Sequence, residues 1–167
     1  MALTEKPALY SGCCLALSTP LLTHISALLP SSPSLVLSIG SGFGLLEAYL
    51  NARPHSLNVV GVEVEPSPNK YLPASNHRIV HGSRFLEPLA KEASAWLFIY
   101  PRRAGLLLEY LTEYGESSVE KIIWAGPKAD WVDYIGCFGG WDVKAQGADE
   151  FGGRAWELIA VASKRTK

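Results

Sequence analysis

The sequence lacks the features that mark several large classes of protein. Its three cysteines, two of them adjacent at Cys13 and Cys14, form neither a disulfide framework nor a metal-ligand spacing. Lys and Arg total 15 against 16 for Asp and Glu, so the basic excess typical of nucleic-acid-binding domains is missing. We therefore expect reduced thiols in a cytoplasmic protein, no metal site and no nucleic acid as partner.

No run of about 20 apolar residues occurs either. The most apolar N-terminal region, 8–29, is interrupted by Pro20 and His24, and no basic segment precedes it. We expect an amphipathic helix there, with Thr19 as N-cap and Pro20 as its first residue, and no membrane partner. The apolar face of this helix would comprise Leu21, Leu22, Ile25, Leu28 and Leu29.

Apolar residues are plentiful enough for one core. They make up 48% of the 167 residues, a length that suits a single domain, and no repeat or second domain is visible. We divide this domain, 1–167, into an N-terminal segment with its helix (1–34), a core (35–163) and a short basic tail (164–167).

The stretch 35–65 is the most informative part of the chain. An apolar run is followed at once by three alternate glycines, then by apolar residues at helical spacing, and then by a second apolar run that ends in acid. This pattern predicts a strand, a turn, a helix and a second strand. Such units bind ligands at the carboxyl ends of their strands.

The glycine spacing decides which ligand is favoured. A dinucleotide site requires a small residue where this chain has Leu45, which disfavours a nicotinamide-dependent oxidoreductase. The pattern is instead G-x-G-x-G, from Gly40 to Gly44, with Glu63 about 20 positions on. It resembles the first two motifs of class I S-adenosylmethionine-dependent methyltransferases. A parallel-sheet turn that binds nothing, with Glu63 on the surface, is the alternative.

This resemblance extends over most of the chain and implies a fold. That fold is α/β, a Rossmann-like three-layer sandwich whose mostly parallel seven-stranded sheet ends in an antiparallel hairpin, with strand order 3-2-1-4-5-7-6. The expected strands are 35–39, 59–64, 79–81, 95–100, 119–125, 141–146 and 155–163. Three prolines between 66 and 73 leave room for only one or two helical turns between the second and third strands.

The resemblance also implies a cofactor, S-adenosylmethionine, and the residues that hold it. Glu63 would accept hydrogen bonds from the ribose hydroxyls, with Glu65 a less favoured candidate, and Ser83 would face the adenine. Tyr100, at the end of the fourth strand, is the candidate catalytic residue, because its hydroxyl can orient a nucleophile. The predicted cofactor-binding residues are Gly40, Ser41, Gly42, Gly44, Glu63 and Ser83.

Some positions depart from the family pattern. Ser38 stands where the first strand usually carries an acid, and Ser83 and Ala95 replace two further acids, which weakens the attraction for a cationic cofactor. Trp124 and Trp131 are expected to line the cleft or to fill the core.

Two functions remain open on the sequence. The favoured one is a methyltransferase with a small-molecule acceptor. The alternative is a protein of the same fold that transfers no methyl group and acts as a partner-binding subunit or catalyses another reaction. The cleft is open to a partner, covered by residues 1–18 or closed by a second copy in a homodimer.

Overall fold

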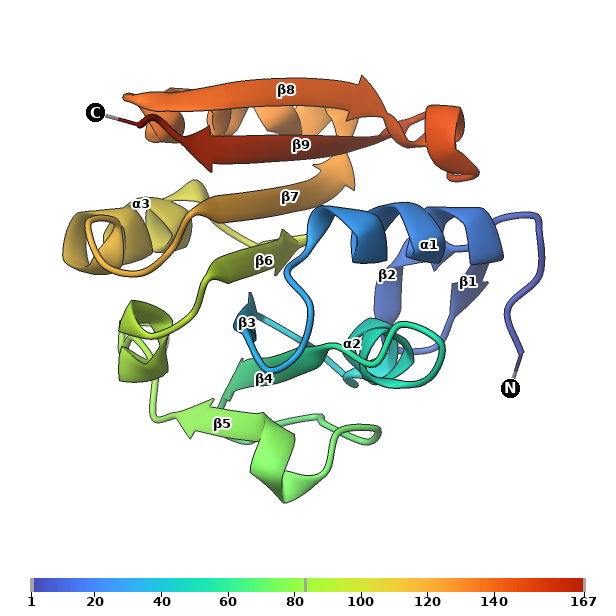
Figure 1. Ribbon diagram of the computed structural model, residues 1–167, viewed down its shortest axis with the longest axis horizontal. Coiled ribbons are helices and arrows are strands. Elements are labelled where there is room, and N and C mark those ends of the chain that lie inside the picture. The colour runs from blue at the N-terminus through green and yellow to red at the C-terminus, as the bar shows by residue number, and fades with distance from the viewer. Residues whose placement is uncertain (1, 83, 167) are drawn as a thin grey trace.

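A seven-stranded sheet forms the centre of the computed structural model, which describes residues 2–82 and 84–166 (Figure 1). The spatial order is β5-β4-β3-β6-β7-β9-β8, and β9 runs in the opposite direction to the other six strands. Counted in chain order within this sheet, that is 3-2-1-4-5-7-6, so the predicted topology is confirmed. The strands are β3 (Leu35–Ile39), β4 (Asn58–Val64), β5 (His77–Val80), β6 (Ala95–Ile99), β7 (Lys121–Pro127), β8 (Trp141–Gly147) and β9 (Glu157–Lys164).

Helices cover both faces of the sheet, as the predicted three-layer arrangement requires. Because side chains alternate along a strand, Val36 packs with α1 (Thr19–Leu28) and α2 (Leu45–Asn51), whereas Leu37 packs with α3 (Ala104–Tyr114). Short 3₁₀ turns complete the two layers. They are η1 (Ala74–Asn76), η2 (Pro88–Lys91), η3 (Lys128–Asp133), η4 (Ile135–Phe138) and η5 (Ala148–Phe151).

A second, two-stranded sheet near the N-terminus was not expected from the sequence. Strands β1 (Ala8–Tyr10) and β2 (Cys13–Leu17) pair antiparallel and lie beside α1 and α2 (Figure 1). Leu15, Ala16 and Leu17 are fully buried in succession. These strands are short, and three consecutive buried residues show no alternation, so the usual strand pattern is absent.

Several predicted boundaries are wrong by a few residues. The N-cap of α1 is Ser18, not Thr19, because the Ser18 hydroxyl both accepts from Leu21 N at 3.1 Å and donates to Gly152 O at 2.8 Å. Within the segment 85–92 the helical structure is the turn η2, and α3 begins at Ala104. The shortened connection between β4 and β5 is confirmed, since its described helical structure is the three-residue turn η1.

None of the helices in the described ranges, 2–82 and 84–166, has the length and apolar character needed to span a bilayer.

Candidate functional site

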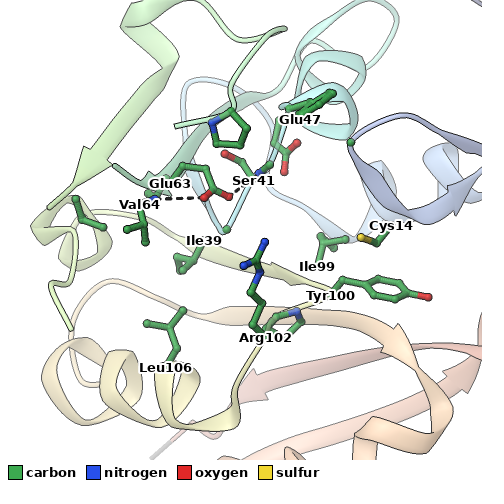
Figure 2. Close-up of a pocket in the computed structure, with 18 of the residues that line it drawn as sticks. Cys14, Ile39, Ser41, Glu47, Glu63, Val64, Ile99, Tyr100, Arg102 and Leu106 are labelled. Atoms are coloured by element: carbon green, nitrogen blue, oxygen red, sulfur yellow. Dashed lines mark hydrogen bonds between the residues drawn. The ribbon is translucent and has the colours of Figure 1, made fainter. Parts of the chain in front are cut away.

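A cavity of about 810 Å³ opens where β3, β4 and β6 end. Its volume is within the range of sites that enclose a small organic ligand. Its wall includes the turn after β3 with the start of α2, the end of β4, the connection from β6 to α3, and the tip of the β1–β2 hairpin (Figure 2). The predicted site is therefore at the carboxyl edge of the sheet, where the strand–turn–helix pattern placed it.

The turn after β3 presents bare backbone to this cavity. Gly40 has φ +82°, and a Cβ atom there would meet nothing within 4 Å. The turn is fixed from behind, because Gly40 N and Ser41 N both donate to Val62 O, at 2.9 and 3.1 Å. A ligand can therefore approach the main chain at Gly40 closely without displacing a side chain.

Glu63 faces the same turn from the end of β4. Its Oε2 accepts a hydrogen bond from Gly42 N at 2.7 Å, and its Oε1 accepts one from Val64 N at 3.2 Å. The buried Ser41 hydroxyl has no hydrogen-bond partner among the described residues. The structure thus brings Gly40, Ser41, Gly42 and Glu63 together on one wall. Their roles toward a cofactor remain predictions.

The other two predicted cofactor residues are placed differently. Gly44 is not on the cavity wall; it is the N-cap of α2 with φ +81°, and a Cβ there would lie 2.9 Å from both Asn69 Oδ1 and Leu72 Cγ. Its geometry gives it a packing role, and its contact with a cofactor remains a prediction. Ser83 lies outside the described residues.

Sequence reasoning missed one cavity residue, Glu47 in the first turn of α2. Only 2% of its surface is exposed, and Ser38 Oγ donates a hydrogen bond of 2.5 Å to its Oε2. Burial, with a smaller contribution from the charge of Glu63, raises the pKa of Glu47 to about 7, although the Ser38 hydrogen bond acts in the opposite direction. A lone acid between Leu46 and Ala48 in an apolar helix is the signal that could have identified it.

Tyr100 directly follows β6 and lies on the cavity wall, with φ +50°. Its ring points away from Glu63 (Figure 2), and its hydroxyl donates to the carboxylate of Glu157 in β9. Burial and the Glu157 carboxylate both raise the pKa of Tyr100 far above its ordinary range. The phenol is therefore neutral at physiological pH, and its oxygen keeps lone pairs that can accept a hydrogen bond. The catalytic role remains a prediction.

The two tryptophans expected to line the cleft or fill the core are core residues. Trp124 and Trp131 are 1% and 8% exposed, and their rings pack 5.0 Å apart, centroid to centroid. Tyr134 packs against the Trp124 ring from the same layer. Neither tryptophan is part of the cavity wall.

The N-terminal hairpin covers part of the cavity. Its turn contributes Gly12 and the start of β2 contributes Cys13 and Cys14 to the wall, and a Cβ at Gly12 would lie 2.1 Å from the Phe43 ring. The hairpin is therefore packed directly on the glycine turn. The sequence left open whether the cleft is open to a partner, covered by residues 1–18 or closed by a second copy. The hairpin, which belongs to residues 1–18, covers at least part of it. In the described part of the chain, no three His, Cys, Asp or Glu side chains are grouped to hold a metal ion.

The chain resembles known proteins in structure but matches none of the compared sequences. No protein-family model and no curated protein sequence matches the chain. Among solved structures, precorrin-6Y C5,15-methyltransferase from Geobacter metallireducens matches with a TM-score of 0.67 and 12% identity over 95% of this chain and 94% of that one. The methyltransferase domain of bacterial CtHen1-C matches with a TM-score of 0.63 and 14% identity, over 88% of this chain and 98% of that one.

A third structure was solved with a ligand. Human N-acetylserotonin methyltransferase, in complex with S-adenosylmethionine (SAM), matches at a TM-score of 0.60 with 14% identity, over 88% of this chain and 51% of that one. At such identities the likeness establishes a shared fold.

Proposed function

We propose that this chain, whose fold is that of class I S-adenosylmethionine-dependent methyltransferases, binds S-adenosylmethionine in the cavity and transfers its methyl group to a small molecule. The observation that carries the proposal is the juxtaposition of bare backbone at Gly40 with the carboxylate of Glu63, held 2.7 Å from Gly42 N. The residues present fit the cofactor in size and chemistry, because a partly enclosed cavity, an open main-chain turn and a carboxylate meet at one edge of the sheet.

Each of these residues has a distinct part in binding. The Glu63 carboxylate has the acceptor oxygens that two ribose hydroxyls require, and its bond to Gly42 N keeps it at a fixed distance from the turn. Bound S-adenosylmethionine supplies an electrophilic methyl carbon. The main task of the protein is then to hold that carbon in line with the acceptor atom, which accounts for a rigid turn tied to Val62 O.

A small molecule is the acceptor that the cavity favours. The β1–β2 hairpin covers one side of the opening, and Arg102 extends into the space from the β6–α3 connection (Figure 2). The chain also has no basic excess with which to hold a nucleic acid. A partly enclosed site with a net charge of −1 on the whole chain suits a metabolite better than a polyanion.

Tyr100 is the residue proposed to orient the acceptor. Because its hydrogen is donated to Glu157, its oxygen can only accept, as it would from an acceptor hydroxyl or amine. Tyr100→Phe is expected to lower kcat about tenfold or more while the Kd for S-adenosylhomocysteine (SAH) changes less than twofold. If kcat and the affinity for S-adenosylhomocysteine fell by the same factor, Tyr100 would be assigned to folding or cofactor binding instead.

The test of the reaction is a search for products. Purified protein is incubated with a small-metabolite extract and S-adenosylmethionine, and the extract is compared by mass spectrometry with one treated with heat-inactivated protein. A metabolite heavier by one CH₂ group supports the proposal. Binding of S-adenosylhomocysteine without any methylated product supports the alternative, a protein of this fold that transfers no methyl group. Ser38 and Ala95, which stand where the family usually has acids, favour that alternative.

A further inference from the structure

The buried carboxylate of Glu47 has no role in the binding scheme above. It is on the wall of the cavity although only 2% of the residue is exposed, and Figure 2 shows it beside Ser41. Within the described ranges it forms no ion pair, and its one side-chain hydrogen-bond donor is the hydroxyl of Ser38. Its own backbone N–H is a second donor, and both donors favour the ionised form. A carboxylate that is removed from water and has only neutral donors is nevertheless costly to ionise.

The groups around Glu47 increase this cost. Helix α2 packs against β2, β4 and α1. The charge of Glu63 in β4 acts on Glu47 and raises its pKa, whereas Cys13 of β2 is a neutral thiol whose own pKa is raised to about 12, first by burial. His24, the titratable residue of α1, stacks on Phe151 instead. Among the residues that the structure describes, no neighbour supplies the positive charge that this carboxylate lacks.

The position of Glu47 compensates for a gap in the sequence. Ser38 stands two residues before Gly40, where an acid was expected from the resemblance and is missing. The hydroxyl of Ser38 holds the Glu47 carboxylate at 2.5 Å, so a carboxylate reaches that place from α2 rather than from β3. The cavity therefore has two acids on its wall near the glycine turn, Glu47 and Glu63.

We propose that Glu47 is a binding residue for a cationic group of the ligand in this cavity, the α-ammonium or the sulfonium of S-adenosylmethionine. The proposal rests on the proposed function. An ion pair with the ligand supplies the counter-charge that is absent in the free protein. The carboxylate then becomes fully ionised, so ligand binding releases a proton wherever free Glu47 is protonated.

The pH dependence of ligand affinity follows from the pKa of Glu47 in the free protein, which is about 7. Below that pH the ligand must displace a proton, so affinity rises as the pH is raised from 6.0 to 7.5, by roughly eightfold for full ionisation in the complex. Glu47→Gln removes the titrating group and is expected to abolish this dependence.

Calorimetric titration of wild type and Glu47→Gln at both pH values tests the proposal. The ligands are S-adenosylmethionine, S-adenosylhomocysteine and 5′-methylthioadenosine, which has neither cation. Glu47→Gln is expected to weaken S-adenosylmethionine binding about 10- to 100-fold at pH 7.5 and to leave 5′-methylthioadenosine within twofold. An equal loss for S-adenosylhomocysteine identifies the ammonium as the partner; a loss for S-adenosylmethionine alone identifies the sulfonium.

Two further variants control the result. Glu116→Gln makes the same charge change on an exposed residue and is expected to bind all three ligands like wild type. Glu47→Asp keeps the charge and is expected to retain the pH dependence even if the shorter side chain weakens binding. If the wild type binds and Glu47→Gln binds S-adenosylmethionine and S-adenosylhomocysteine with affinities within twofold of the wild type's, this inference alone is overturned. If the wild type binds none of the three ligands, the proposed function is contradicted as well.

Discussion

The two acids on the cavity wall, Glu47 and Glu63, are held in opposite ways. Glu63 is only half-buried, and two backbone N–H groups donate to it. Glu47 is almost fully buried and relies on the Ser38 hydroxyl. The first carboxylate has its donors in the free protein, and the second is poised to ionise when a cation arrives.

Glu47 makes the stability of the free protein depend on pH. Its pKa is about 7 when folded against an ordinary value of 4.5, so between these values the folded state binds more protons than the unfolded state. The free energy of unfolding therefore falls as the pH rises from about 4.5 through 7, by about 3 kcal/mol in total from this group.

Glu47→Gln is expected to remove that contribution. Urea unfolding at pH 5 and pH 8 is the measurement, and the variant should be the more stable protein at pH 8. A wild-type pH dependence that persists unchanged in the variant would show that Glu47 ionises freely in the folded state.

Glu63 is expected to carry cofactor affinity rather than stability. Glu63→Ala should weaken S-adenosylhomocysteine binding by about 1–3 kcal/mol, the cost of losing hydrogen bonds to a charged group. Glu65→Ala is the matched control, because Glu65 is two residues further on and pairs with the exposed His81 at 2.8 Å. Equal affinity in wild type and Glu63→Ala, or a larger loss in Glu65→Ala, would withdraw the role assigned to Glu63.

At the scale of elements, the turn between β3 and α2 combines a half that faces the cavity with a half that packs against the loop after β4. Gly40 and Gly44 have almost the same φ, +82° and +81°, yet a Cβ would meet open space at the first and Leu72 with Asn69 at the second. The loop after β4 is tied to this turn, since Lys70 N and Tyr71 N both donate to Phe43 O at 3.0 Å. That loop takes the place of the missing crossover helix.

The two glycines form a matched pair for mutation. Both Gly40→Ala and Gly44→Ala should lose about 1–3 kcal/mol of stability from backbone strain, and Gly44→Ala should lose roughly 1 kcal/mol more from overpacking. Gly40→Ala should lose more ligand affinity, because its methyl group enters the cavity. Thermal unfolding and calorimetry measure the two effects; the reverse order of affinities would mean that the ligand is bound elsewhere than at Gly40.

Elements with strong periodic or apolar patterns could be predicted from the sequence, and the others could not. The strand at 35–39, the glycine turn and the acid at Glu63 share one short stretch, so their proximity follows from local spacing. The β1–β2 hairpin has no such pattern, and its place against Phe43 depends on tertiary packing. Glu47 belongs to the same class, because only the folded chain shows that its helical position brings it to Ser38.

At the scale of the whole molecule, the seven-stranded sheet brings three parts of the candidate site to one edge. β3, β4 and β6 are adjacent and parallel, so their carboxyl ends deliver the glycine turn, Glu63 and Tyr100 to one edge. The far end of the chain contributes as well, because Glu157 of β9 accepts hydrogen bonds from the Tyr100 hydroxyl and, at 3.4 Å, from Ala16 N of β2. Global topology was predictable, since a family resemblance specifies strand order, whereas such cross-links between distant segments were not.

Calorimetric titration of the wild-type chain with S-adenosylhomocysteine, alongside NADH, tests the central claim most directly. We expect one S-adenosylhomocysteine to bind per chain and NADH not to bind. Saturable NADH binding, or no heat from either compound, would contradict the assignment of this cavity to an S-adenosyl cofactor.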